Sequence, residues 1–113
     1  MSIMTKMVDA LEAVEIRAYL PGRAPGGCQS AHAIVTDGGR VPLGKTTGRH
    51  IYYVTACVPA ARPGDLTELT RRIGDALVGL RELRATGDVS ESFFDDEKGA
   101  YCAAVEFSAL CAL

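Results

Sequence analysis

An amphipathic segment lying between stretches of strand-like sequence constrains the fold of this chain more than any other feature. From Asp65 to about Arg81, apolar side chains recur at helical spacing and form one stripe: Leu66, Leu69, Ile73, Leu77 and Leu80. Pro63-Gly64 interrupts the preceding chain, and Asp65 and Glu68 stand at the two positions of a capping box. Because such a stripe has to be covered, the sequence predicts a helix over residues 65–81 packed on one face of a β-sheet.

Strand-like segments flank this predicted helix on both sides. Residues 51–58 precede it and are rich in β-branched and aromatic side chains, while residues 89–94, a polar turn at 95–99 and residues 101–110 follow it. In the last segment the side chains expected to face the core are Tyr101, Ala103, Val105, Phe107 and Ala109. We expect the strands before and after the helix to share one sheet, with a right-handed crossover if they run parallel, and residues 93–101 to add an antiparallel hairpin.

The first half of the chain predicts a further helix and a further strand. An amino-terminal helix, capped by Ser2 or Thr5, follows from the helical spacing of Met4, Met7, Val8, Leu11 and Val14. Residues 15–20 fit either helix or strand, residues 30–36 predict a strand, and residues 38–48 predict a long loop of the kind that often docks partners. The fold class is therefore α+β, with a small mixed or antiparallel sheet and two helices in a single domain over residues 1–113.

Composition excludes several classes of protein. Hydrophobic residues make up 48% of the chain, which excludes a disordered protein, yet no apolar run approaches the length of a membrane span. Asp9 and Glu12 stand where a signal peptide needs an apolar core, so we expect a cytosolic location and no membrane partner. Without dense spacing or a secretion signal, the four cysteines are predicted to be reduced: Cys28, Cys57, Cys102 and Cys111.

Charge separates into a basic and an acidic region. No acid occurs between Asp37 and Asp65, where the basic residues are Arg40, Lys45, Arg49 and Arg62. Acids gather instead around the last turn: Asp88, Glu91, Asp95, Asp96 and Glu97. In a ring built by head-to-tail contacts each subunit presents two different complementary surfaces, and a basic loop facing an acidic turn would supply them. The candidate interface residues are Arg40, Lys45, Arg49, Asp95, Asp96 and Glu97; the alternative is two independent solvated loops.

The chain contains only weak matches to sequence motifs for catalysis, metal binding or ligand binding. Residues 39–46 match the phosphate-loop pattern G-x-x-x-x-G-K-T, but they lead into the strand-like residues 51–58 instead of a helix. Cys28, His32, His50 and Cys57 lack the spacing of a zinc site, and the acidic turn lacks that of a calcium loop. Four cations in a chain of net negative charge are a weak footprint for nucleic acid, so no specific nucleic-acid binding is expected. We therefore predict no catalytic residues, no metal and no cofactor, and a protein that is not an enzyme.

The order of elements resembles that of the tail terminator proteins of long-tailed bacteriophages, especially those that infect GC-rich actinobacteria. The segments that carry the resemblance are the amino-terminal helix with residues 14–22, the strands over residues 31–35 and 49–58, the helix over residues 65–80 and the closing strand over residues 101–107. The resemblance covers most of the chain, and it rests on a pattern of elements.

The resemblance implies a structural role in the neck region of a virion assembled in the host cytoplasm. Subunits of that family form a homohexameric ring on the finished tail tube, stop its polymerisation and offer a surface to head-completion or connector proteins. The implied partners are therefore other copies of the chain, the tail tube protein and the connector, while DNA can pass through the ring.

Other functions stay open at this point. Head–tail connector, neck and tail tube proteins share related α+β elements. A small dimeric α+β module that binds a ligand would have the same pattern of helix and sheet. An enzyme that uses residues 39–46 is the third class, and loss of a phosphate ligand on Lys45→Ala would reveal it.

Overall fold

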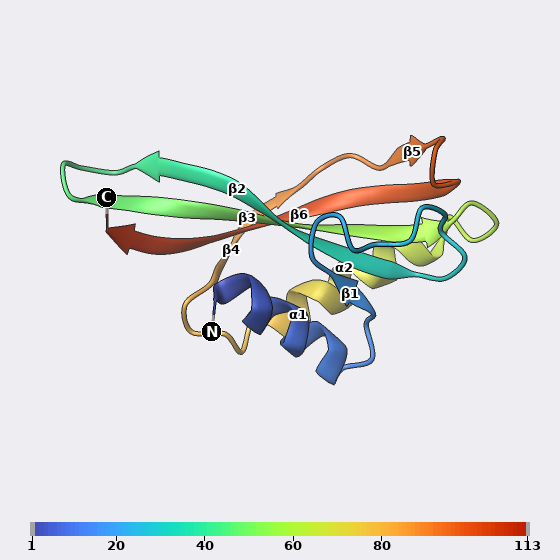
Figure 1. Ribbon diagram of the computed structural model, residues 1–113, viewed down its shortest axis with the longest axis horizontal. Helices are drawn as coiled ribbons and strands as arrows, with labels where there is room; N and C mark the ends of the chain where they lie inside the picture. The colour runs from blue at the N-terminus through green and yellow to red at the C-terminus, as the bar shows by residue number, and fades with distance from the viewer. Residues whose placement is uncertain (1, 113) are drawn as a thin grey trace.

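The computed structural model describes residues 2–112 and contains two helices and a six-stranded sheet (Figure 1). In chain order the elements are α1 (Ile3–Ala13), β1 (Ala18–Tyr19), β2 (His32–Pro42), β3 (Thr47–Pro59), α2 (Asp65–Leu77), β4 (Arg84–Val89), β5 (Phe93–Asp95) and β6 (Ala100–Ala112). The strand order is β1-β2-β3-β6-β4, and β5 also pairs with β6. β1 runs parallel to β2, and every other pairing is antiparallel. The predicted α+β class is confirmed.

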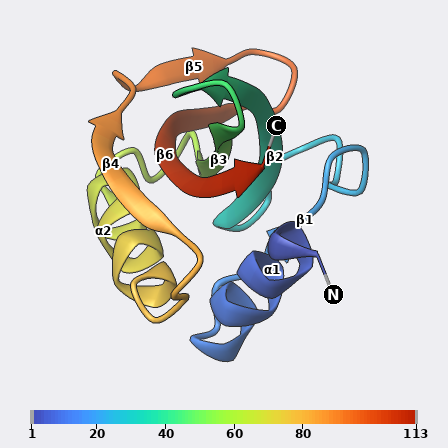
Figure 2. The same cartoon turned by 90° about the vertical axis from the view of Figure 1, so that its left-hand side faces the viewer.

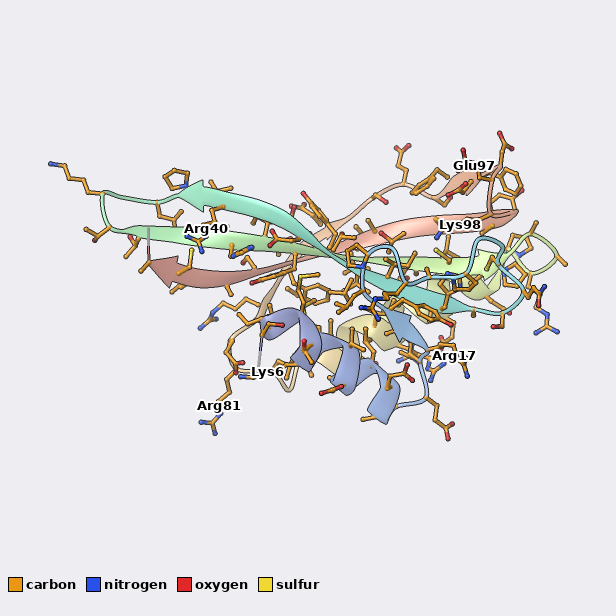
Figure 3. All side chains as sticks on the ribbon, in the orientation of Figure 1. Lys6, Arg17, Arg40, Arg81, Glu97 and Lys98 are labelled. Atoms are coloured by element: carbon orange, nitrogen blue, oxygen red, sulfur yellow. The ribbon has the colours of Figure 1, made fainter. Side chains whose placement is uncertain are left out.

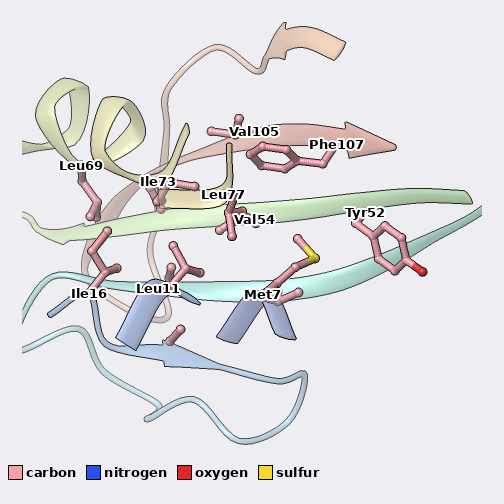
Figure 4. Packing of buried hydrophobic residues seen from close by; sticks show 14 of the residues in the cluster. Met7, Leu11, Ile16, Tyr52, Val54, Leu69, Ile73, Leu77, Val105 and Phe107 are labelled. Carbon is pink, nitrogen blue, oxygen red and sulfur yellow. The ribbon is translucent and has the colours of Figure 1, made fainter. Parts of the chain in front are cut away.

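Both helices cover the same face of the sheet, while β5 pairs with the outer edge of β6, on the side of the molecule away from the helices (Figure 2). The main core forms where α1 and α2 meet the sheet. Met7 and Leu11 enter it from α1, and the α2 stripe enters it beside Val54 and Phe107 of the central strands (Figure 4). All of these side chains are almost completely buried, so their removal from water supplies the main stabilisation of the fold.

α2 confirms the predicted stripe, but it ends earlier and begins differently than predicted. Leu66, Leu69, Ile73 and Leu77 are the buried residues of the helix. After Leu77 the chain turns tightly, and the Leu80 N–H donates to the carbonyl of Leu77. Gly79, a poor helix former, lies within this turn. The predicted capping box is wrong: Gly64 is the N-cap without a side-chain bond, and the N–H of Asp65 is satisfied by the carbonyl of Arg62 in the preceding turn.

α1 confirms the amino-terminal helix. Ser2 caps it by accepting a hydrogen bond from the N–H of Thr5. Val14, predicted to belong to the apolar stripe, lies after the helix and is exposed. Its carbonyl accepts a hydrogen bond from Arg72 of α2, which ties the two helices together. The ambiguous residues 15–20 form the two-residue strand β1, after a sharp turn in which Glu15 has a φ of 64°.

The strands before and after α2 lie in one sheet, as predicted, but they are not neighbours. Both β3 and β4 are antiparallel to β6, which lies between them, so β3 and β4 run parallel to each other. The single strand predicted over residues 89–94 is divided into β4 and β5. At the break, Ser90 exchanges hydrogen bonds with the backbone of Ala104 through its own N–H and its hydroxyl. The predicted core-facing set of β6 is confirmed, with Tyr101 only partly buried.

The long loop predicted over residues 38–48 is wrong, because most of it is strand. β2 continues to Pro42 and β3 begins at Thr47, which leaves a short turn. Asp37-Gly38-Gly39 forms a β-bulge, in which the Gly39 N–H donates to the Asp37 carboxylate. Glycines inside a strand often mark a bulge, which explains why residues 38 and 39 belong to β2 although the predicted strand ended at Thr36. Together with residues 109–112 of β6, residues 38–50 form a three-stranded projection beyond the helices, named the arm below (Figure 1).

Candidate assembly interface

The three basic candidates all lie on the arm, but they do not share one face. Arg40 pairs with His50 across the hairpin, and Val41 pairs with Arg49. Because neighbouring residues of a strand point to opposite faces, Arg40 and Arg49 project from opposite sides of the arm. Lys45 lies in the turn at its tip. All three side chains are exposed, so the arm carries positive charge on both faces and at its end.

The three acidic candidates form the turn between β5 and β6, where they have different tasks. The Asp95 carboxylate accepts hydrogen bonds from the N–H groups of Glu97 and Lys98, which holds the turn closed. Asp96 and Glu97 are exposed. The carbonyl of Lys98 accepts a hydrogen bond from the Cys28 N–H, so the loop after β1 also anchors this turn. Asp96 and Glu97 therefore present the negative charge, and Asp95 shapes the backbone that carries them.

The basic and acidic candidates lie at opposite ends of the molecule. Figure 3 shows Arg40 on the arm at one end of the long axis and Glu97 at the other. The molecule measures 47 Å along this axis and 26 and 24 Å across it. The two groups of charges thus do not meet within the chain.

A small polar cluster fixes the base of the arm. His50 Nε2 lies 2.8 Å from the Asp37 carboxylate, and the His50 ring stacks on Tyr52 with centroids 4.5 Å apart. Hydrogen bonds from the Gly39 N–H and from His50 lower the pKa of Asp37, so this residue is ionised at neutral pH. These contacts hold the bulge at the point where the sheet leaves the cover of the helices.

The phosphate-loop pattern of residues 39–46 has the wrong geometry for phosphate binding. These residues run through the end of β2 into the hairpin turn, where the N–H groups of Leu43 and Gly44 both donate to the carbonyl of Thr47. A phosphate loop instead directs free N–H groups at its ligand from a turn that opens into a helix. The match is therefore limited to the sequence pattern and does not extend to the structure.

A second small core lies on the face of the sheet opposite the helices. It contains Cys28, Cys57 and Cys102, and the Cys57 and Cys102 sulfurs are 3.4 Å apart without a bond. Burial raises the pKa of Cys57 to about 12 and raises that of Cys28 and Cys102 as well, so all three are protonated, unreactive thiols at neutral pH. Over residues 2–112, no three Cys, His, Asp or Glu side chains are placed to hold a metal ion.

An open groove of about 640 Å³ lies beneath the arm. Its lining includes Ile3, Arg49, Arg81, Glu82, Arg84 and Leu110. Lys6 neutralises Glu82 through an ion pair of 2.8 Å, while none of the three arginines forms an ion pair with any other residue between 2 and 112. The groove is consequently basic, with Arg81 projecting below the arm (Figure 3).

An exposed acidic and apolar segment continues from the groove to the far end of the molecule. This segment, residues 88–97, is named the strap. Besides its acidic residues, it exposes Val89, Phe93 and Phe94, each by 46% or more of its surface. Phe94 rests edge-on against Tyr101. Three large apolar side chains in one exposed segment are a typical mark of an interface.

Arg81, Arg84 and the phenylalanines of the strap were not among the residues predicted from the sequence. The two arginines follow α2, and they join Arg49 only because β4 pairs with the part of β6 that borders the arm. The pair Phe93-Phe94 was readable as strand sequence, but strands bury most such residues, so its exposure could not be predicted.

Comparison with known proteins gives no family. No protein-family model matches the chain, and no curated protein matches it. Among the elements described, neither helix combines the length and the apolar character that crossing a membrane requires.

Proposed function

We propose that this chain is a structural protein that forms a ring on the end of a phage tail tube, ends tube growth and offers the surface on which the head is joined. The single observation that supports it most is the separation of charge: a basic arm and an acidic turn occupy opposite ends of an elongated subunit. Such a subunit has one surface for the neighbour ahead and a different one for the neighbour behind, as a head-to-tail ring requires.

The mechanism of the proposed function is geometric. A ring whose one face matches the end of the tube and whose other face does not resemble a tube subunit blocks further addition. This needs no catalytic residue, no metal and no cofactor. The partners are other copies of the chain, the tail tube protein and a connector or head-completion protein. By the family resemblance the ring has six subunits. A place in the tail tube itself or elsewhere in the neck is the nearest alternative within the same structural class.

Electron microscopy of tail tubes mixed with the purified protein tests this proposal. The expected result is extra density at one end of each tube and arrest of elongation when tube subunits are supplied. Density along the sides of tubes, growth that continues past the bound protein, or no binding at all would contradict it.

A small ligand-binding module is the second candidate, and the groove beneath the arm favours it. Its volume of about 640 Å³ falls within the range of roughly 300–1,000 Å³ that is usual for small-molecule sites. Its three arginines would suit an anionic ligand. A stable dimer that ignores tail tubes, together with saturable binding of a small anion that Arg84→Gln abolishes, would support this function over the ring.

A further inference from the structure

The groove beneath the arm has an unused sheet edge along one wall. Even-numbered residues of β6 direct their backbone groups away from β3, as the mutual hydrogen bonds of Ser90 and Ala104 show. The last pair between β4 and β6 joins Arg84 to Ser108. Beyond it, the N–H and C=O of Leu110 face the groove without a backbone partner among the described residues. An extended peptide placed there would continue the sheet.

The side chains around this edge define the chemistry of such a peptide. The peptide is expected to carry acidic side chains, because the groove contains three arginines that have no ion-pair partner among residues 2–112: Arg49, Arg81 and Arg84. Leu110 is 76% exposed and lines the groove together with the partly buried Ile3, which favours an apolar residue in the peptide. The groove therefore fits an extended segment that mixes acidic and large apolar residues.

The strap has this composition and this conformation. Phe93–Asp95 is already a strand, paired on one edge only with β6. Its acids and its exposed apolar side chains lie within ten residues of sequence. A subunit cannot place β5 in its own groove. Asp95 of β5 pairs with Ala100, whereas Ser108 lines the groove. These two residues of β6 are eight positions apart, a separation of roughly 27 Å. The segment that reaches the groove has to come from another copy.

We infer that the groove of one subunit binds the strap of the next, with β5 of the neighbour added to the free edge of β6 beside Leu110. This inference builds on the proposed ring, and it moves the basic half of the contact from the tip of the arm to the groove beneath it. The exposed apolar side chains of the strap become buried against Leu110 and Ile3, and the three arginines set direction and register.

Two charge-reversed variants test the inference by reciprocal rescue. The groove variant carries Arg81→Glu and Arg84→Glu; the strap variant carries Glu91→Lys and Asp96→Lys and leaves the turn-forming Asp95 intact. Arg17→Glu with Arg23→Glu is the matched control, since both of these cations are exposed, lie outside the groove and are not interface candidates. Mass is measured by light scattering at low ionic strength, where charge pairs are least screened, and circular dichroism checks folding.

The expected results are specific. Each variant alone associates at least tenfold more weakly than the unmodified protein, the control changes less than threefold, and an equal mixture of the two variants regains the unmodified mass, because every contact again joins opposite charges. If a variant fails to fold, the milder Arg81→Gln, Arg84→Gln pair replaces it and is expected to weaken association without rescue by the strap variant.

Three results would overturn the inference. They are association of the groove variant at unmodified strength, loss of association in the control to the same extent as in the variants, and folded variants that the mixture does not rescue. The last result would assign the groove to a different ligand.

The same samples separate this inference from the proposed function. Reciprocal rescue by a protein that never appears at the ends of tail tubes would leave the contact standing and remove the tail function. Binding of the unmodified protein at tube ends, combined with unimpaired assembly of the groove variant, would support the tail function and remove the contact between groove and strap.

Discussion

The two ends of the sheet are built from the same strands but held in different ways. Where α1 and α2 cover it, Val54 and Phe107 are almost completely buried in a continuous core. In the arm, the same β3 and β6 expose Arg49 and Leu110, and beyond the polar cluster at its base the strands are joined by their backbone ladder. Stability therefore resides mainly in the helix-covered part, and the arm is free to use its side chains and edges for contacts with other molecules.

The largest expected effect lies in the helix-covered part. Ile73→Ala removes a completely buried side chain of α2 and is expected to lower the free energy of unfolding by about 2–5 kcal/mol. Urea unfolding followed by circular dichroism measures it. Val78→Ala, at a side chain 82% exposed, is the control and should change stability by less than about 0.5 kcal/mol. Equal losses for both variants would contradict the packing described for α2.

A change in the arm should affect assembly and leave stability alone. Arg49→Glu reverses a charge of the groove and is expected to weaken self-association by roughly tenfold, or about 1.4 kcal/mol. Lys45→Glu at the tip changes the same charge outside the groove and should have a smaller effect. Sedimentation velocity at several concentrations compares the two. A stronger effect of Lys45→Glu would return the contact to the tip of the arm.

The bulge offers a way to loosen the arm by itself. A Cβ at Gly38 would lie 2.5 Å from Tyr53 Cε2 and 3.1 Å from Ile51 Cγ2, so Gly38→Ala displaces a half-buried ring. We expect a cost below about 1 kcal/mol, since the ring can move toward solvent, and faster amide hydrogen exchange confined to the arm. Gly44→Ala, whose Cβ would come no nearer than 3.4 Å to a neighbour, serves as control. Equally accelerated exchange in α1 and α2 would show that the two parts are not separate.

The smallest effect concerns the pH dependence of the base of the arm. The pKa of Asp37 lies below its ordinary value of 3.8, so its ionised form stabilises the fold above that pH, and the contribution is lost as the pH falls through the lowered pKa. Because the side chain is about half exposed, the expected loss is within about 1 kcal/mol. Stability of Asp37→Asn should be lower than that of the unmodified protein at pH 6 and equal to it at strongly acidic pH. A difference that grows on acidification would contradict this assignment.

The local spacing of apolar residues predicted the helices and strands of this fold better than the residues at which they begin and end. The stripe of α2 and the alternation along β6 were readable, because both depend on the spacing of apolar residues. The end of α2 at Leu77 and the bulge at Gly38 were not, because each depends on contacts with distant parts of the chain. Propensity alone did not decide between a loop and a strand for residues 38–48.

The candidate interface was predictable only in part for the same reason. The charged residues Lys45, Asp96 and Glu97 were visible in the sequence, and their exposure follows from their chemistry. Their location at opposite ends of the molecule follows from the topology, since β6 carries the chain from the acidic turn to the base of the arm. The groove joins Arg49 to Arg81 and Arg84, more than thirty residues away, and no local pattern could join them.

The mass of the unmodified protein in solution tests the central claim of a head-to-tail assembly most directly. Light scattering over a range of concentrations, with negative-stain images of the same samples alone and with tail tubes, gives the result. We predict masses well above the 12.0 kDa of one chain and above that of a dimer, with closed rings in the images and rings at the tube ends. A monomer or dimer of constant mass at every concentration, absent from tube ends, would contradict the account.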